Sequence, residues 1–174
     1  SVGGAVRSNL SGDVNDASGV TVTATGNNNA EAYALPVSVG LFAGAVADAE
    51  ALVTNTADVE AKVGSTATLN VPGAAVNVTA AGDNNAFASG TMVGASVVAA
   101  LGAMLPTAKI DGGVLAEFAG DITGTAASLT TLATGENTAT ADTFVANVSI
   151  GAGASGARAV AEINHLAGFR MGYI

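Results

Sequence analysis

Hydrophobic and polar residues alternate along three similar stretches of this chain. In the first stretch, Val20, Val22 and Ala24 alternate with threonines. A period of two indicates a strand with one buried face. The sequence therefore predicts three equivalent strands. Their buried positions form three files across the repeats: Val20, Val76 and Leu129; Val22, Val78 and Thr131; Ala24, Ala80 and Ala133.

Each stretch continues into a glycine that is followed two positions later by an asparagine. The glycines are Gly26, Gly82 and Gly135, and the asparagines are Asn28, Asn84 and Asn137. Glycine adopts positive φ without penalty and asparagine tolerates it, so this pair predicts a corner in each repeat. Asparagines stacked at one corner also predict a ladder of side-chain amides. A second corner is predicted 29 residues beyond each glycine, at Asn55, Asp111 and Asn164.

The glycines are 56 and 53 residues apart, and a near-constant period of this size is typical of repeat proteins. We therefore predict a single repeat domain over 1–174. It comprises a partial turn (1–18), two full repeats (19–74 and 75–127) and an incomplete third repeat (128–174). The predicted fold is all-β, a flattened β-solenoid or layered β-arch of about three repeats of roughly 55 residues.

Two alanine-rich segments leave a helix open as an alternative. Residues 44–53 and 95–105 suit a helix by propensity, because alanine is the best helix former. Their glycines and the neighbouring β-branched residues favour strands instead. A short helix on one face of each repeat therefore remains the alternative to the all-strand interpretation.

Composition restricts the function more than it identifies it. The chain is 49% hydrophobic but only 4% aromatic, so its core must be built from alanine, valine and glycine. Five basic residues against a net charge of −9 exclude the basic patch of a nucleic-acid-binding protein. No apolar run reaches the about 20 residues of a membrane span. Cysteine is absent, which excludes disulfides and thiolate metal sites.

The repeated phrase supports a resemblance to known proteins. The pattern Val-x-Val-Thr-Ala-Thr at 20–25, with the run Val-Gly-Leu-x-Ala-Gly-Ala at 39–45, resembles the repeats of large bacterial filamentous adhesins of the leukotoxin-like class. The composition also resembles the tubular-sheath proteins of filamentous methanogens, which behave as functional amyloids. Both resemblances imply a structural protein at the cell surface, without catalytic residues or cofactors.

The residues of the chain indicate no enzyme. His165 is the single histidine, its nearest acidic neighbour in sequence is Glu162, and no Gly-x-Ser-x-Gly motif is present. A corner residue without catalytic chemistry is the favoured interpretation of His165. We predict no catalytic and no cofactor-binding residues. A carbohydrate-active β-helix enzyme is the least favoured alternative, because no acidic cluster recurs on one face.

Acidic corner residues are the only metal candidates, and calcium is the metal that they suit. They are Asp83, Asp111, Asp121 and Glu136. Carboxylate oxygens bind Ca²⁺, but the glycine-rich nonapeptide of calcium-binding β-rolls is missing. Solvated turns without metal are therefore favoured.

Three sequons and one threonine row complete the candidate sites. Asn9, Asn77 and Asn147 each begin an Asn-x-Ser/Thr motif, so they are candidate N-glycosylation sites if the protein is exported. The threonine row at 21–25 has the spacing of ice-binding surfaces. It decays in the later repeats, which favours ordinary outward-facing β-formers.

We predict a subunit that assembles itself through β-strand edges into an extracellular filament, tube or sheath. The alternative is a shaft fragment of a cell-surface adhesin. The chain begins at Ser1 without a leader pattern, and we expect a signal peptide to have been removed. By the repeat register, Asp13 and Ile174 occupy about the same point on successive turns. We expect both termini to lie near the contact, because neither end carries a polar cap.

Overall fold

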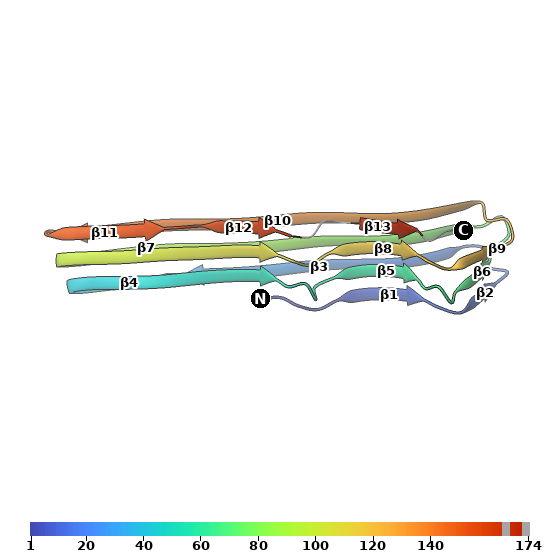
Figure 1. The fold of residues 1–174 in the computed structure, drawn as a ribbon, viewed down its shortest axis with the longest axis horizontal. Coiled ribbons are helices and arrows are strands. Elements are labelled where there is room, and N and C mark those ends of the chain that lie inside the picture. The colour runs from blue at the N-terminus through green and yellow to red at the C-terminus, as the bar shows by residue number, and fades with distance from the viewer. Residues whose placement is uncertain (165–167, 172–174) are drawn as a thin grey trace.

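The computed structural model describes residues 1–164 and 168–171, and all of their regular structure is β-strand. The all-β prediction is confirmed (Figure 1). The predicted short helix is wrong, because residues 44–53 lie in strand β4 and residues 95–105 lie in strand β7. In both segments the backbone pairs with a strand of another repeat, and this tertiary pairing outweighs the helix propensity of alanine.

The thirteen strands of the described residues form three open sheets in which every pairing is parallel. A four-stranded sheet has the order β1-β5-β8-β13, and a three-stranded sheet has the order β2-β6-β9. In the six-stranded sheet, β3, β4, β10, β11 and β12 all pair with the central strand β7. The strands are β1 Val6–Leu10, β2 Asp13–Asn15, β3 Val20–Ala34, β4 Val37–Val53, β5 Val59–Val63, β6 Thr68–Asn70, β7 Ala75–Ile110, β8 Val114–Phe118, β9 Asp121–Thr123, β10 Ser128–Ser149, β11 Ala152–Ala157, β12 Val160–Ile163 and β13 Gly168–Met171.

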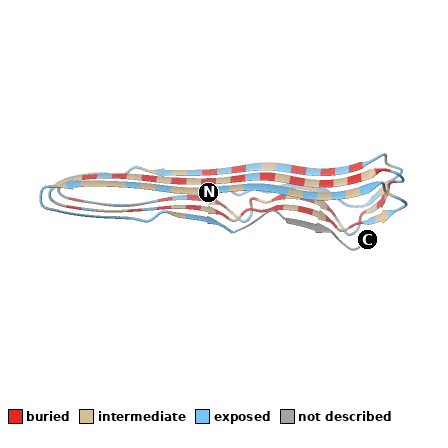
Figure 2. Ribbon diagram, turned by 90° about the horizontal axis from the view of Figure 1, so that it is seen from above, coloured by how far each residue is buried: buried red, intermediate tan, exposed pale blue. Residues whose placement is uncertain are grey.

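Each repeat runs outward along the long axis of the molecule, bends, and returns. Outward segments 20–40, 75–96 and 128–149 pair with one another, and return segments 42–53, 99–110 and 152–163 do the same. The bend in the first repeat coincides with a register shift between Gly40 and Phe42. The bends lie together at one end, which we call the distal end (Figure 2). The return segments then continue into the short strands of the opposite, proximal end.

The register predicted for the repeated phrase is confirmed. Val20 pairs with Val76 and Val76 with Leu129, at offsets of 56 and 53 residues. Val76 and Val78 on the central strand are fully buried, whereas Leu129 and Thr131 on β10 are half-buried. The third repeat is more exposed because β10 lies at the edge of the sheet.

Small side chains fill the space between the outward and return layers. At the proximal end, valines and alanines of β3 and β7 pack against β5, β6 and β8, with Phe118 as the largest buried side chain. A second cluster in the middle is mostly alanine. β7 contributes one segment to the outward layer and one to the return layer, and the two face each other toward the distal end. Met92 of the outward segment lies over Gly102, and Met104 of the return segment lies over Gly90. These methionines leave no room for a Cβ at either glycine.

Prolines explain two interruptions of the strands. Pro106 of β7 has no N–H to donate, and its register neighbour in the third repeat is Ala159, which lies between β11 and β12. Pro36 separates β3 from β4 in the same way.

The predicted corner at the repeated glycine and asparagine is wrong. Gly26, Gly82 and Gly135 lie inside the continuous strands β3, β7 and β10, as do Asn28, Asn84 and Asn137. Gly26 and Gly82 are required by close packing, not by a turn. A Cβ on Gly82 would lie 2.7 Å from Cγ2 of Val114, and one on Gly26 would lie 2.6 Å from Cγ2 of Val59. Positive φ angles occur instead at Gly12, Gly73, Gly124 and Asp16.

Candidate functional site: the asparagine ladder and the strand edges

The asparagines of the three repeats form a directional ladder between the two layers. Nδ2 of Asn28 donates to Oδ1 of Asn84 at 2.8 Å, and Nδ2 of Asn84 donates to Oδ1 of Asn137 at 2.9 Å. The same amides also donate across the layers, from Asn28 to the carbonyl of Ala57 at 3.3 Å and from Asn84 to that of Gly112 at 3.5 Å. The predicted ladder is therefore present, in a strand interior and not at a corner.

The predicted second corner does lie where strands end. Asn55 is in the turn between β4 and β5, Asp111 lies between β7 and β8, and Asn164 follows β12. Nδ2 of Asn164 donates to Oδ1 of Asp111 at 2.7 Å, so this corner has amide contacts of its own. Because Ala57 and Gly112 belong to the same connections, the interior ladder fixes their position relative to the outward strands.

We expect Asn84→Ala to lower the free energy of unfolding by about 3 kcal/mol, because it removes the hydrogen bonds that the Asn84 amide makes with Asn28, Asn137 and the carbonyl of Gly112 between the layers. Asn85→Ala is the matched control. Asn85 is the next residue, and its Nδ2 donates outward to Oδ1 of Asn29 at 2.9 Å on the exposed face. The control should lose less than about 1 kcal/mol. Urea unfolding of the two variants measures the difference, and equal losses would contradict a structural role for the inner ladder.

The acidic candidates do not converge on a metal site. Asp83 and Glu136 are register neighbours on the exposed face of β7 and β10. Asp111 forms an ion pair with Lys109 at 3.3 Å, and Asp121 is exposed in β9. No cluster of three metal-ligating side chains occurs within 1–164 and 168–171. The expectation of solvated turns without metal stays a prediction, with calcium binding as its alternative, and His165 lies outside the described residues.

The three sequons have different surroundings. Asn9 is exposed on β1, and Asn77 is half-buried on the solvent-facing side of β7. Asn147 lies over Gly94, and its Nδ2 donates to the carbonyl of Ala154 at 3.2 Å. Its Oδ1 is buried. Glycosylation therefore stays a prediction that fits Asn9 and Asn77 better than Asn147.

Both long edges of the six-stranded sheet are open. On one side, β3 and β4 pair only with β7 among the described residues, except for a bridge between Val53 and Val2. On the other side, β10, β11 and β12 pair only with β7 in the described part of the chain. β3 is 15 residues long, β4 is 17 and β10 is 22. Exposed edges of this length present rows of unpaired backbone groups and are templates for another strand.

Buried polar atoms without partners gather on one of these edges. Within the described residues they are Oγ1 of Thr131, Oγ1 of Thr143 and Oδ1 of Asn147, and all three belong to β10. Buried polar groups in native proteins are nearly always hydrogen-bonded, so an unpaired group calls for an explanation. A strand laid along the open edge of β10 would bring donors and acceptors to this row.

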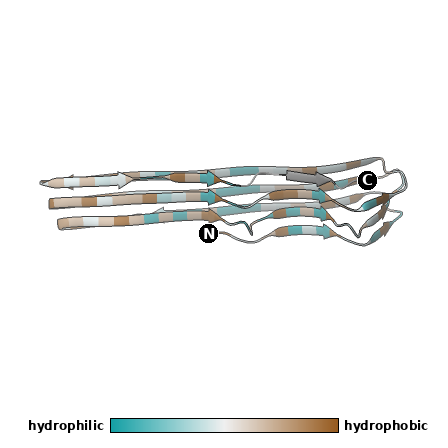
Figure 3. Ribbon diagram, in the orientation of Figure 1, coloured by the Kyte–Doolittle hydropathy of each residue, from teal (hydrophilic) through white to brown (hydrophobic). Residues whose placement is uncertain are grey.

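The distal end is uncharged and exposes large hydrophobic side chains. No charged residue occurs within 32–47, 84–108 or 143–157, the three segments that form this end. Hydrophilic colours accordingly gather toward the proximal end in Figure 3. The most exposed of the large hydrophobic residues here are Tyr33, Leu35, Val37, Val39, Leu41, Phe42, Val46, Leu101, Phe144, Val148 and Ile150. Apolar patches of this extent are rare on monomeric proteins and typically mark an interaction surface.

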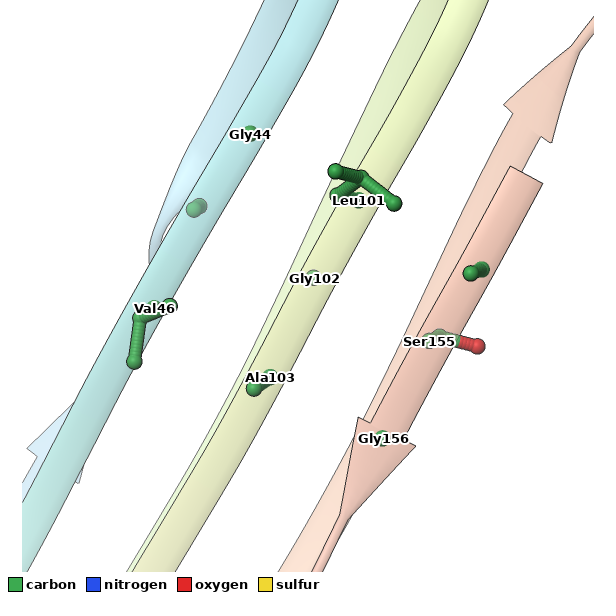
Figure 4. A pocket seen from close by; sticks show the side chains of 9 residues that line it. Gly44, Val46, Leu101, Gly102, Ala103, Ser155 and Gly156 are labelled. Atoms are coloured by element: carbon green, nitrogen blue, oxygen red, sulfur yellow. The ribbon is translucent and has the colours of Figure 1, made fainter. Parts of the chain in front are cut away.

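The return layer of this end contains a shallow apolar groove (Figure 4). Leu101 projects from the middle strand between the smaller residues of its neighbours, Gly44 and Ala154. Only Ser155 among the lining residues carries a polar side chain. No acidic, basic or histidine side chain lines the groove beside Ser155.

Tyr33 marks the boundary between the uncharged and charged regions. Its hydroxyl donates to Oε2 of Glu31 at 3.2 Å, and its ring lies 5.6 Å from that of Phe87. Partial desolvation and the negative charge of Glu31 raise the pKa of the Tyr33 phenol, which therefore stays neutral at pH 7.

No family model, curated protein or solved structure matches the chain. In the described ranges, no helix of the length and apolarity needed to cross a membrane is found.

Proposed function

We propose that this protein is a structural subunit that stacks head to tail through its open strand edges and so builds an extracellular filament, tube or sheath. The observation that carries the proposal is the pair of long, unpaired parallel edges, β3–β4 on one side and β10–β12 on the other. The repeat architecture that we propose for the subunit is the flattened β-solenoid, in which each turn adds one strand to every sheet.

The two edges are complementary because they belong to the same repeat. β3 already pairs in parallel with β7, and β7 pairs in parallel with β10, at the same register positions. A second copy that places its β3 on β10 repeats this geometry once more. Such a contact joins different surfaces of the two copies, so it generates an open polymer unless the rotation closes a ring.

The row of unpaired polar atoms on β10 fits this junction. Ser38, Gly94 and Asn147 occupy one register position in successive repeats. In the stacked arrangement, Ser38 of the incoming subunit takes the next place after Asn147. Its hydroxyl is then a donor beside the buried Oδ1 of Asn147, and Asn28 of the same subunit extends the amide ladder beyond Asn137.

The size of the junction favours a very stable polymer. β3 and β4 together contain 32 residues, and a parallel pairing forms roughly one backbone hydrogen bond per residue. Even at about 0.5 kcal/mol of net stabilisation each, these bonds supply on the order of 15 kcal/mol before side-chain packing is counted. The polymer is therefore expected to resist detergent and protease, as an extracellular structure must.

The uncharged distal surface supports the same conclusion. In a stack, the exposed side chains of the distal end would form a continuous apolar stripe along the polymer, and such stripes are normally covered. Catalysis finds no support in the groove or in the acidic residues.

Electron microscopy of the purified protein tests the proposal. We expect ordered polymers many subunits long, assembled from this chain alone. Short rods of uniform length would favour the adhesin shaft, and a monodisperse globular particle at high protein concentration would contradict both.

A further inference from the structure

From the pairing registers we infer that subunits join by strand exchange: β1 of the incoming subunit displaces β13 from the edge of β8. This inference rests on the proposed function and specifies the contact between two copies. The four-stranded sheet has the order β1-β5-β8-β13, so β1 and β13 are its two edge strands. That sheet contains four strands, whereas the outward layer contains only β3, β7 and β10.

The extra strand creates a conflict when two copies stack. Placing β3 of the incoming subunit directly on β10 puts its β5 two strand positions beyond β8. One strand position then lies between these two strands, and two segments would have to occupy it. β13 of the resident subunit already pairs with β8, from Gly168↔Leu115 to Met171↔Phe118. β1 of the incoming subunit already pairs with its own β5, from Val6↔Val59 to Leu10↔Val63.

Keeping both segments would require a costly gap. If β1 of the incoming subunit lay on top of β13, its β3 would stand two strand positions beyond β10, with one position empty between them. The 22-residue edge of β10 would then face an empty slot for the sake of pairing β13, which has 4 residues. Backbone groups buried at such a slot would lose their hydrogen bonds, so one of the two segments must leave.

β1 is held in its own subunit by several contacts, and its displacement would break them. Backbone hydrogen bonds in its own subunit hold it at both ends: the amide of Val6 donates to the carbonyl of Asp58 at 2.8 Å, and the amide of Gly64 donates to the carbonyl of Leu10 at 2.9 Å. Nε of Arg7 forms an ion pair with Glu60 at 3.1 Å, and Leu10 packs against the proximal core. Displacing β1 would break these contacts.

Exchange also continues the side-chain files of the sheet. Val6, Val59 and Val114 occupy one register position on successive strands. Two glycines of the outward layer are each packed by two of these valines, Gly26 by Val59 and Val6 and Gly82 by Val114 and Val59. With β1 of the incoming subunit on β8, its Val6 follows Val114, and the valine file continues across the junction. The resident β13 gives up four residue pairings and β1 replaces them with five.

Cysteine cross-linking tests the exchange, because the chain has no cysteine of its own. The register predicts that Asn9 of the incoming subunit takes the place next to Glu117, which Arg170 holds in the free subunit. Adjacent strands are about 4.8 Å apart, which suits a disulfide, whereas next-nearest strands at about 9.6 Å are too distant. Lys62 separates Asn9 from Glu117 within one chain.

Asn9→Cys subunits are therefore mixed in equal amounts with Glu117→Cys subunits or with Arg170→Cys subunits, and the polymers are oxidised. Lys62→Cys/Glu117→Cys in one chain is the control for geometry and should form an intrachain disulfide. We expect a covalent dimer from the Asn9→Cys and Glu117→Cys mixture only. A dimer from the Arg170→Cys mixture alone, or from neither mixture, overturns the exchange.

Sedimentation of the same samples separates this inference from the proposed function. Polymers without the expected dimer overturn the exchange alone, whereas the absence of polymers overturns both. A deletion of residues 164–174 gives a second test, because it removes the competing β13. We expect this variant to polymerise with a lag several-fold shorter than that of the full chain. A folded deletion variant that no longer polymerises would show that β13 is part of the junction.

Discussion

Val78→Asp should prevent the protein from folding and therefore from assembling. Val78 is fully buried in the middle of β7, and its register neighbours on both sides are Val22 and Thr131. Asn28 and Asn84 are the only buried polar side chains among the described residues, so the carboxylate would be buried without a positively charged partner. We expect a loss of more than about 4 kcal/mol, which is a large part of the stability of a typical domain.

Thr79→Asp is the matched control for this variant. Thr79 is the next residue, and by strand alternation its side chain lies on the outward face, where Asp83 is native on the same strand. The control should retain the circular dichroism spectrum and the polymers of the unchanged protein. Normal polymers from Val78→Asp would show that position 78 is outside the core, and an equal loss in both variants would show that the inner face is not the sensitive one.

The alternation of hydrophobic residues was sufficient to predict the register of the outward strands. A one-residue slip would have turned Val76 and Val78 to the surface, so the pattern determines the pairing wherever one face is buried. The amide ladder was also predictable, because asparagines recur at one position of the repeat. Both features depend on side chains that repeat, and repetition is visible in a single sequence.

The position of the ladder was predicted less well, for a physical reason. Glycine followed by asparagine is typical of turns, but it also suits a strand that closely approaches another layer. Gly82 has no room for a Cβ because Val114 lies opposite, and no local pattern reveals a residue that is 32 positions away. The short strands β6 and β9, of three residues each, are likewise too brief to give a period.

Thr25→Pro should suppress assembly while the subunit stays folded. The amide of Val93 donates to the carbonyl of Pro36, so odd-numbered residues in this part of β7 donate toward the first repeat. By the same alternation, the amide of Thr25, the register partner of Ala81, points away from β7 into the open edge. A proline there keeps the internal pairing, removes an edge donor and places its ring in the path of the next strand.

We expect this substitution to cost the junction at least about 3 kcal/mol, from one lost hydrogen bond and the steric conflict of the ring. That free energy corresponds to a roughly 100-fold higher protein concentration at which polymers first appear, measured by sedimentation. Thr79→Pro is the control for the direction of the amide. Thr79 is an odd-numbered residue of the central strand, so its amide donates to β3, and the variant should lose its fold. Thr25→Val should assemble normally, because it keeps the amide. Unchanged polymerisation of Thr25→Pro, in a folded subunit, would show that the edge of β3 is not the surface through which the copies join.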